Sequence, residues 1–463
     1  MSNANCIQWD IDLIRRYDLS GPRYTSYPTA LQFDPELSAD DLVTKARQST
    51  DRHSPLSLYV HIPFCEHVCY YCACNKVITR RRDKAQPYLD VVYREMEKLS
   101  HWYSDSRQVN QLHWGGGTPT FISDDQMREL MGELRRNFNL RDDDRGDYSV
   151  EVDPREADDA TLATLREIGF NRVSLGVQDL DPKVQEAVNR IQPMELTARV
   201  LDTSRALGFK SINMDLIYGL PYQTLDGFDA TLDKVIAMSP DRLSVFNYAH
   251  LPDRFRSQRH IRAEDLPSPE TKLAILQSTI ERLLAAGYVY IGMDHFAKPD
   301  DELALAQASG RLHRNFQGYT THSDCDLVAM GVSAISQIGD VYYQNEHDIS
   351  AYTQAVEAHQ HAIRRGVTLN RDDHIRRSVI TQLICHFELD TKRIEQQYAI
   401  DFGQYFRTEL EELKQFAGDG LVQADEDHIR VTPAGRLLIR RICMAFDAYI
   451  PREQATARYS RII

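Results

Sequence analysis

The sequence lacks any apolar run near the roughly 18 residues that a membrane-spanning helix requires. Its start, Met1–Asn5, has neither the basic nor the apolar segment of a secretion signal. Basic charge is also scarce, because 54 Lys and Arg face 68 Asp and Glu, a net charge of −14. These absences predict a cytoplasmic protein without a membrane span, and they argue against non-specific nucleic-acid binding, which depends on clustered cations. With 463 residues, two or three domains are expected.

Cysteine, by contrast, is concentrated in one place. Cys65, Cys69, Cys72 and Cys74 directly follow the apolar run Leu56–Ile62, which predicts a strand ending in a thiol-rich loop. Thiolates select zinc, copper(I) or iron–sulfur clusters. A structural zinc site and plain buried cysteines stay open as alternatives, although zinc sites usually draw their ligands from separated pairs. The spacing Cys-x3-Cys-x2-Cys resembles the signature of the radical S-adenosylmethionine superfamily, in which three cysteines bind a [4Fe–4S] cluster.

Strands and helices alternate after this loop. The sequence predicts strands over residues 56–62, 109–114, 148–152, 172–177, 212–217 and 242–247, and helices near 85–103, 123–138, 195–207 and 224–238. This alternation predicts an α/β fold with a parallel sheet, and six units predict a partial (β/α)6 barrel of the TIM type. We expect this core to cover residues 51–365, preceded by an arm, residues 1–50, that contributes to the substrate site.

Residues 366–463 have a different, mostly helical texture. Helices are expected over 375–387 and 402–416, followed by two short strands around an acidic turn and a last helix that begins at Thr432-Pro433. This order predicts a winged-helix-like C-terminal domain. Such domains often bind DNA, but a lid or support over the barrel is the favoured interpretation here.

Polar residues follow several of the predicted strands, at the end where barrel enzymes place their sites. Gly115–Thr118 leaves the backbone open to a ligand, or forms only a tight turn. Glu151 is either a solvated carboxylate or an acceptor for a ribose hydroxyl or an amine. Asp215 lies in an apolar run and needs a partner, for which Arg190 is the candidate. The basic run Arg254–Arg262 is either solvated or holds a polycarboxylate.

Together these motifs resemble the family of oxygen-independent coproporphyrinogen III oxidases of bacterial haem synthesis, over essentially the whole chain. The resemblance rests on Gly21–Thr29, Tyr59–Cys65, Cys74, His113–Thr120, Glu151–Glu156, Asp215–Pro221 and His313–Tyr319. Three departures are mild: Ala73 stands where Gly is usual, Tyr71 where Phe is common, and Gly117 where many members of the wider superfamily have Glu.

The resemblance implies a [4Fe–4S] cluster and two molecules of S-adenosylmethionine. It implies that the cluster ligands are Cys65, Cys69 and Cys72. It implies that the first S-adenosylmethionine contacts Tyr59, Gly116, Glu151 and Ile335, and that the second contacts Tyr71, Gly117, Thr118, Gln178, Arg190, Asp215 and Ala249. Cys74, Phe316 and Gln317 match positions tied to activity but not to cluster binding.

The implied reaction converts two propionates of coproporphyrinogen III to vinyl groups, with loss of CO2, and gives protoporphyrinogen IX. Each turnover would use two S-adenosylmethionine molecules, an electron donor such as a flavodoxin or ferredoxin, and an unknown electron acceptor. We expect a monomer that binds no nucleic acid. The rival hypotheses are a related haem-delivering protein, which generally lacks the fourth cysteine and the arm, a radical RNA-modifying enzyme, and a zinc-dependent winged-helix regulator.

Overall fold

The computed structural model describes residues 6–104, 106–425 and 427–450, and these form two compact units. The first unit, here the barrel unit, comprises Phe33–Thr279 and Asp324–Thr368. The second unit, here the terminal unit, comprises Met1–Gln32, Ile280–Ser323 and Leu369–Ile463. No helix among the described residues is long and apolar enough to cross a membrane.

Six parallel strands form the centre of the barrel unit, and they lie side by side in chain order. They are β1 (Leu56–Ile62), β4 (Gln108–Gly116), β6 (Asp147–Val152), β7 (Arg172–Gln178), β8 (Ser211–Tyr218) and β9 (Arg242–Asn247). All six were predicted, each within a few residues of its observed ends. The predicted α/β partial barrel is therefore confirmed.

The other edge of β1 carries strands that the sequence did not predict. β14 (Asp326–Met330) pairs with β1 in parallel, and an antiparallel run continues the sheet. That run contains β15 (Ile335–Ile338), β16 (Val341–Asn345) and β17 (Ile363–Thr368).

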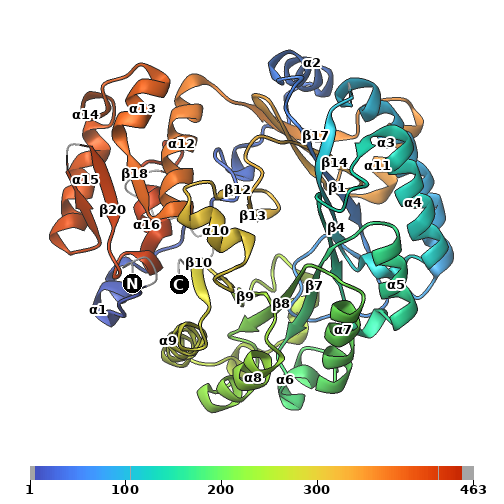
Figure 1. Ribbon diagram of the computed structural model, residues 1–463, viewed down its shortest axis with the longest axis horizontal. Coiled ribbons are helices and arrows are strands. Elements are labelled where there is room, and N and C mark those ends of the chain that lie inside the picture. The colour runs from blue at the N-terminus through green and yellow to red at the C-terminus, as the bar shows by residue number, and fades with distance from the viewer. Residues whose placement is uncertain (1–5, 105, 426, 451–463) are drawn as a thin grey trace. The chain divides into compact units, whose positions relative to one another are not determined.

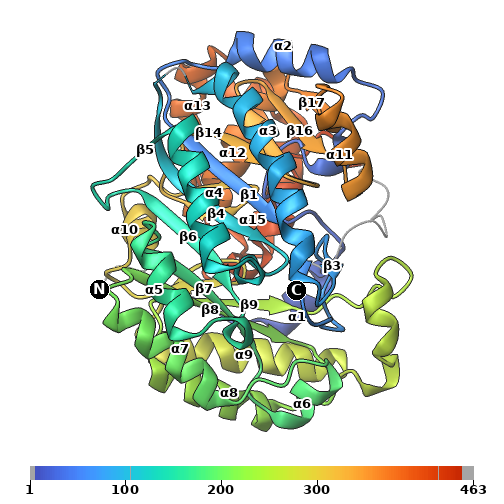
Figure 2. The same cartoon turned by 90° about the vertical axis from the view of Figure 1, so that its right-hand side faces the viewer.

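Helices cover the outer face of the parallel sheet, as Figures 1 and 2 show for α3, α4, α5 and α7. The helices of this unit are α2 (Ala39–Ser49), α3 (Ala85–Tyr103), α4 (Asp124–Asn137), α5 (Asp159–Glu167), α6 (Pro182–Ala187), α7 (Met194–Ala206), α8 (Leu225–Met238) and α11 (Ile349–Glu357). A further helix, α9 (Pro269–Ala285), begins in the barrel unit and ends in the terminal unit, since the division falls after Thr279. The predicted capping box of α4 is present, since Ser123 and Gln126 bond reciprocally. Met127, Leu130 and Leu134 recur at helical spacing and form the buried face of α4.

The two faces of the strands differ in a way that positions the site. In β7, Val173, Leu175 and Val177 are buried, whereas the alternate residues from Ser174 to Gln178 are only partly buried. β8 repeats this pattern, with Met214 buried and Asp215 partly buried. Because side chains alternate across a strand, one face of the sheet packs on the helices while the other presents polar groups.

The terminal unit is mostly helical. It contains α1 (Ile11–Tyr17), α10 (Glu302–Ala308), α12 (Arg371–His386), α13 (Thr391–Tyr398), α14 (Phe402–Tyr405), α15 (Arg407–Gly418) and α16 (Ile439–Met444). Its strands form the hairpins β10 (Val289–Gly292)–β11 (His295–Ala297) and β12 (His313–Asn315)–β13 (Gly318–Thr320), and a sheet of β18 (Glu388–Asp390), β20 (His428–Val431) and β19 (Val422–Ala424). The helices and the three-stranded sheet fit the predicted winged-helix-like domain. The predicted start of the last helix at Thr432 was wrong, because these residues form a turn and α16 begins seven residues later.

Short elements complete both units. β2 (Phe64–Cys65) pairs with β3 (Val77–Ile78), and β5 (Asn139–Leu140) pairs with β4. Single 3-10 turns cover Ala30–Gln32, Arg82–Lys84, Pro119–Phe121, Pro154–Glu156, Arg256–His260, Ala263–Asp265 and Arg436–Leu438. The pairing of β2 with β3 closes the cysteine loop at its base, because the loop lies between these two strands.

Candidate active site

The four clustered cysteines line one cavity of about 270 Å3 in the barrel unit. The cavity walls come from the loop after β1, the glycine segment after β4, the end of β6, and the polar face of β7 and β8. All four cysteines are free thiols. The structure thus brings together residues as far apart in the sequence as Cys65 and Phe246, at the carboxyl ends of the parallel strands, where the fold predicts a site.

Side chains from outside the cysteine loop hold its backbone in place. The Gln258 side chain donates to the Tyr71 carbonyl at 2.9 Å, and the Ser257 hydroxyl donates to the Cys72 carbonyl at 2.9 Å. Lys76, the last residue of the loop itself, donates to the same Cys72 carbonyl at 3.0 Å. The loop has no regular secondary structure between β2 and β3. Its shape therefore depends on these side-chain hydrogen bonds.

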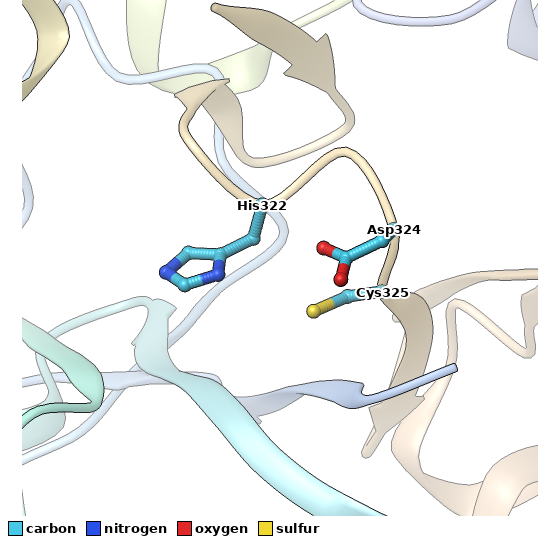
Figure 3. Close-up of side chains that lie close together, drawn as sticks. All are labelled: His322, Asp324 and Cys325. Atoms are coloured by element: carbon cyan, nitrogen blue, oxygen red, sulfur yellow. The ribbon is translucent and has the colours of Figure 1, made fainter. Parts of the chain in front are cut away.

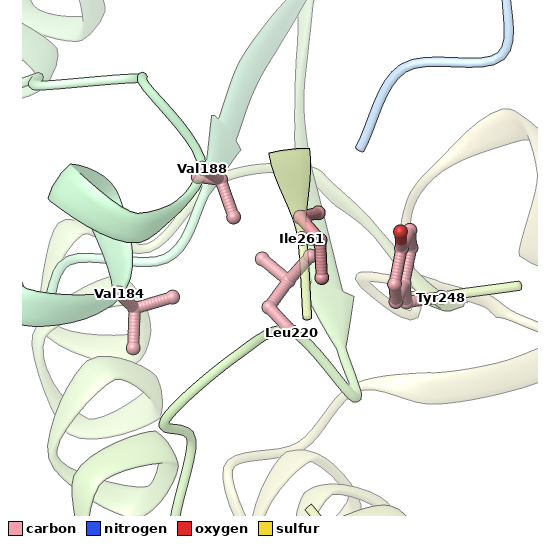
Figure 4. Close-up of a cluster of buried hydrophobic side chains, with 5 residues drawn as sticks. All are labelled: Val184, Val188, Leu220, Tyr248 and Ile261. Carbon is pink, nitrogen blue, oxygen red and sulfur yellow. The ribbon is translucent and has the colours of Figure 1, made fainter. Parts of the chain in front are cut away.

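An apolar cluster supports the loop from one side. Val184, Val188, Leu220, Tyr248 and Ile261 form this cluster (Figure 4), and Tyr70 and Tyr71 of the loop pack against it. The Tyr70 backbone N–H donates to the Val188 carbonyl at 3.0 Å, and the His260 ring stacks on Tyr70 at 4.5 Å between centroids. The aromatic residues between the cysteines therefore anchor the loop, while the sulfur atoms face the cavity.

Two of the cysteine sulfurs accept hydrogen bonds from neighbouring side chains. Thr118 Oγ1 donates to Cys65 Sγ at 3.5 Å. Arg190 Nη1 and Arg155 Nη2 both donate to Cys69 Sγ, at 3.4 and 3.5 Å. Donors around the sulfurs are typical of thiolates that bind metals, because metal ligation deprotonates the thiol and leaves negative charge on the sulfur.

Cys74 is related to Cys72 rather than to the other sulfurs. A hydrogen bond from the Cys74 side chain lowers the pKa of Cys72 to about 6, and the same contact raises the pKa of Cys74 well above its usual value. By contrast, burial raises the pKa of Cys65 to about 12. The Cys74 S–H therefore donates to Cys72 and stabilises the Cys72 thiolate.

Arg190 does not pair with Asp215, so this part of the prediction was wrong. Arg190 Nη1 instead donates to Asp153 at 2.9 Å and Nη2 donates to the Gly176 carbonyl at 2.6 Å. Asp153 also binds Arg155 through both carboxylate oxygens. Desolvation opposes the charge, but Arg190 and Arg155 together lower the pKa of Asp153 to about 2.

Asp215 finds neutral partners instead. Its carboxylate accepts from the Ser174 hydroxyl at 3.0 Å and from the Asn213 side chain at 2.8 Å. Burial raises the pKa of Asp215 to about 6, and the nearby charge of Glu151 adds to this shift. Asp215 thus lines the cavity as an acceptor whose hydrogen-bond partners are neutral side chains.

Glu151 lies at the end of β6, beside the glycine segment. It accepts from the Gly116 backbone N–H at 3.2 Å, and His113 Nε2 lies 3.6 Å from its other oxygen. Desolvation in the cavity would raise the pKa of Glu151, but the His113 and Gly116 contacts outweigh it, and the pKa is lowered. Glu151 is 47% exposed, towards the cavity, and is therefore an ionised acceptor.

The glycine segment is packed against the protein as well as open to the cavity. A Cβ at Gly116 would lie 2.5 Å from the His61 ring, and φ there is +114°. A Cβ at Gly117 would lie 2.6 Å from the Phe64 main-chain oxygen. Both glycines are thus required by close approach of the chain to itself, at the point where the backbone also borders the cavity.

Most of the predicted cofactor residues line this cavity. Those that do are Tyr71, Gly116, Gly117, Thr118, Glu151, Gln178, Arg190 and Asp215. Three others lie elsewhere in the barrel unit: Tyr59 bonds His61 at 3.1 Å, the Ala249 carbonyl accepts from Gln258, and Ile335 begins β15. Phe316 and Gln317 belong to the terminal unit, in the turn between β12 and β13.

The sequence motif Gly21–Thr29 also belongs to the terminal unit, where its tyrosines have structural roles. Tyr24 and Tyr27 are buried, and the Tyr24 hydroxyl donates to Asp447 at 3.0 Å. Arg440 donates to the Pro22 carbonyl at 2.9 Å, and Arg23 forms an ion pair with Asp294. These contacts account for much of the motif through packing within its own unit.

Several residues at the cavity were not predicted from the sequence. Asp153, Arg155 and Lys76 line the cavity, and His113 lies beside it, against Glu151. Asp153 and Arg155 stand within the quoted motif Glu151–Glu156, directly after a predicted strand, so their position was a usable signal. Lys76 follows the last cysteine by two residues, and nothing in its context distinguished it from a solvated lysine.

A second group of metal-ligand types lies in the short loop before β14. The ligand atoms of His322, Asp324 and Cys325 lie within 4.8 Å of one another (Figure 3). Burial, with the adjacent carboxylates, raises the pKa of Cys325 to about 12. His322 and Cys325 are half-buried and Asp324 is exposed, and no second observation on the described residues points to a ligand there, so we assign no metal to this group.

The donor set of the cavity fits an iron–sulfur cluster and a charged organic cofactor. Three soft sulfur ligands face one space, and hydroxyl and guanidinium donors surround two of them. Arg190 Nε is buried without a hydrogen-bond partner among the described residues, which leaves a donor for an anionic group. Glu151 and Asp215 provide acceptors for hydroxyls or an amine.

Comparison with known proteins gives the class and then the family. Residues 59–235 match the model of the radical SAM superfamily, and residues 369–438 match that of the HemN C-terminal domain. The fold and the cysteine loop thus define a radical S-adenosylmethionine enzyme. Oxygen-independent coproporphyrinogen III oxidases from Pseudomonas aeruginosa and Escherichia coli are 60% and 52% identical to this chain, each over 99% of both chains. The chain belongs to the family of oxygen-independent coproporphyrinogen III oxidases.

A solved structure extends this likeness to three dimensions. The coproporphyrinogen III oxidase (HemN) of Escherichia coli, described as a radical SAM enzyme, superposes with a TM-score of 0.92 at 52% identity, and the match covers 96% of this chain and 100% of that one. The predicted family, the enzyme class and the use of a [4Fe–4S] cluster with S-adenosylmethionine are confirmed by these matches. The roles of individual residues stay predictions.

Proposed function

We propose that this protein converts two propionate groups of coproporphyrinogen III to vinyl groups without oxygen and so forms protoporphyrinogen IX. The observation that carries this proposal is one cavity in which the cysteines, three acidic side chains and the buried Arg190 meet, within a chain that matches the named family from end to end. When bound, the cluster and S-adenosylmethionine supply the electron and the hydrogen-abstracting radical. The protein holds these groups, orients them and excludes water and oxygen.

Cys65, Cys69 and Cys72 would hold the cluster. Their spacing, their common cavity and the donors around the sulfurs support this assignment. Cys74 is proposed as a residue for turnover that does not bind iron. Its contact with the Cys72 side chain would keep its S–H beside the cluster, without a place in the ligand set.

The first S-adenosylmethionine would lie against Tyr59, Gly116, Glu151 and Ile335. The ionised Glu151 carboxylate suits a ribose hydroxyl or an amino group, and the glycine backbone allows close approach. The second S-adenosylmethionine would lie against Tyr71, Gly117, Thr118, Gln178, Arg190, Asp215 and Ala249. Arg190 Nε and the Asp215 carboxylate are the groups best suited to its carboxylate and hydroxyls.

The substrate carries four carboxylates and needs cations. The exposed guanidinium groups of Arg256 and Arg259 stand on the same 3-10 turn whose Ser257 and Gln258 bind the cysteine loop. We propose that these arginines bind propionates, together with the arm of residues 1–50, while Phe316 and Gln317 act on the substrate. The reaction also needs an electron donor, such as a flavodoxin or ferredoxin, and an electron acceptor. A cytoplasmic monomer without nucleic acid is the expected form.

The test is an anaerobic assay with the cluster reconstituted, coproporphyrinogen III, S-adenosylmethionine, a reductant and an acceptor. The expected products are CO2, 5′-deoxyadenosine and protoporphyrinogen IX. Cys72→Ser should abolish all three, whereas Cys6→Ser, at an exposed cysteine far away in the sequence, should abolish none. A wild-type protein with a full cluster that makes no 5′-deoxyadenosine would refute the proposal, and zinc without iron would refute the cluster site.

For the arginines, Arg256→Glu and Arg259→Glu should raise the KM for coproporphyrinogen III and leave the iron content unchanged. The physical reason is that both guanidinium groups are exposed, while the contacts to the cysteine loop come from their neighbours. Lys414→Glu is a matched control at an exposed cation paired with Glu411. An unchanged KM in the double variant would end this part of the proposal.

A further inference from the structure

Cys69 differs from the other cysteines because two arginines donate to its sulfur. Arg155 Nη2 lies 3.5 Å from Cys69 Sγ, and Arg190 Nη1 lies 3.4 Å from the same atom. Neither contact is made by neighbours in the sequence, since both arginines are more than 80 residues from Cys69. The sequence order therefore gives no reason for this convergence, whereas the fold does.

Asp153 holds both guanidinium groups in position. Arg155 binds it with Nε and Nη2, at 3.0 and 2.7 Å, which is the fork geometry of a strong ion pair. Arg190 Nη1 binds the same carboxylate at 2.9 Å. The exposed fractions of the three side chains are only 9% for Asp153, 13% for Arg155 and 7% for Arg190. We call these three residues the arginine clamp.

The clamp carries one net positive charge, because two guanidinium groups face one carboxylate. This charge lies in a desolvated place where water screens it poorly, directly against a sulfur that would bind iron. Hydrogen bonds to cluster sulfurs and nearby positive charge favour the reduced cluster, which carries one more electron than the oxidised one. The direction of the effect follows: the clamp makes the cluster easier to reduce.

We propose that the arginine clamp raises the reduction potential of the cluster bound through Cys69, and that Arg155 is a positioning and tuning residue of this enzyme. The proposal rests on the proposed assignment of Cys69 as a cluster ligand. Arg155 is the better probe of the two arginines, because Arg190 is also proposed to bind S-adenosylmethionine. Within the part of the chain that the structure describes, the Arg155 side chain donates hydrogen bonds only to Asp153 and to Cys69.

The experiment is a redox titration of the reconstituted full-length protein, followed by the electron paramagnetic resonance signal of the reduced cluster, without S-adenosylmethionine or substrate. Arg155→Gln removes the charge and the fork, whereas Arg155→Lys keeps the charge and loses the fork. Arg199→Gln is the matched control, because Arg199 also pairs with a carboxylate, Asp159 at 2.6 Å, and its other hydrogen bond goes to the Ala157 carbonyl rather than to a cysteine.

We expect the midpoint potential of Arg155→Gln to be more negative than those of the wild type and Arg199→Gln, with Arg155→Lys between them. A full cluster with an unchanged potential in Arg155→Gln would overturn the proposal. If Arg155→Gln fails to bind iron, Arg155→Met replaces it, because it keeps the aliphatic stem and also removes the charge; a full cluster with the wild-type potential in that variant would overturn the proposal. A wild-type protein that forms no [4Fe–4S] cluster would instead contradict the proposed function itself.

Discussion

Gln258 is the residue whose loss should most directly disturb the cysteine loop. It is 1% exposed and makes three hydrogen bonds to main-chain groups. Its amide donates to the carbonyls of Tyr71 and Ala249, at 2.9 and 3.2 Å, and its oxygen accepts from the Leu251 N–H at 2.6 Å. In Gln258→Leu the volume is nearly kept, but all three main-chain groups lose their partner.

The expected loss of stability follows from the number of main-chain groups that lose their hydrogen-bond partner. Each buried hydrogen bond contributes about 1 kcal/mol net, and an unsatisfied buried group costs about 1–3 kcal/mol, so Gln258→Leu should lower the free energy of unfolding by about 3 kcal/mol or more. For a unit of this size the melting temperature should fall by about 6–12 °C. Ser257→Ala removes a single bond, to the Cys72 carbonyl, and should cost about 1 kcal/mol.

The assay combines thermal unfolding of the protein without metal with iron content after anaerobic reconstitution. Gln258→Leu should lose both melting temperature and iron, and Ser257→Ala should lose less of each. Gln354→Leu is the control, because Gln354 is an exposed glutamine of the same unit whose side chain donates only to Ser350. A Gln258→Leu protein that melts with the wild type and binds a full cluster would refute the reasoning that neighbouring side chains set the shape of the loop.

Three further predictions concern single positions at the cavity. Cys74→Ser should keep its cluster and lose turnover, whereas the control Cys6→Ser should change neither. Loss of iron in Cys74→Ser would instead make Cys74 a cluster ligand. Gly117→Ala should have a lower melting temperature and bind less iron, because the added Cβ would lie 2.6 Å from a main-chain oxygen. The control Gly132→Ala, on an open helix face, should raise the free energy of unfolding by about 0.5–1 kcal/mol. Equal shifts in the melting temperature of the two variants would contradict this reasoning. The pKa of Asp215 is raised from 3.8 to about 6, so between these pH values the folded protein keeps the carboxyl proton that the unfolded chain has released. The stability that the protonated Asp215 side chain contributes is therefore lost as the pH rises through this window. Asp215→Asn should have a higher melting temperature than the wild type at pH 7 but not at pH 3.5. The same difference in melting temperature at both pH values would refute this.

The sequence predicted the parallel strands because their signals are local. Leu56, Leu58, Val60 and Ile62 form an apolar strand whichever partners it finds, and Ser123 with Gln126 marks a helix start within four residues. β14 was missed for the opposite reason. It is a five-residue strand that pairs with β1 across about 270 positions of the chain, and no local pattern encodes that pairing.

The candidate site shows the same division between features that local sequence patterns predict and contacts that only the fold decides. The cysteines were identified because their spacing is dense and local. The partner of Arg190 was predicted wrongly because residue types alone make Asp215 and Asp153 equivalent carboxylates. Only the fold decides between them, since the end of β6 brings Asp153 within 2.9 Å of Arg190, while Asp215 is satisfied by two neutral donors.

One short turn links the two halves of the proposed chemistry. Within the five residues of Arg256–His260, Ser257 and Gln258 bind the cysteine loop, whereas Arg256 and Arg259 are exposed. Because successive side chains of such a turn point in different directions, one backbone can hold the loop on one side and present cations on the other. A shift of this turn would therefore move the arginines proposed to bind propionates and the cysteines proposed to bind the cluster together. Iron content and substrate KM should respond jointly to changes at the anchoring residues, while changes at the exposed arginines should affect KM alone.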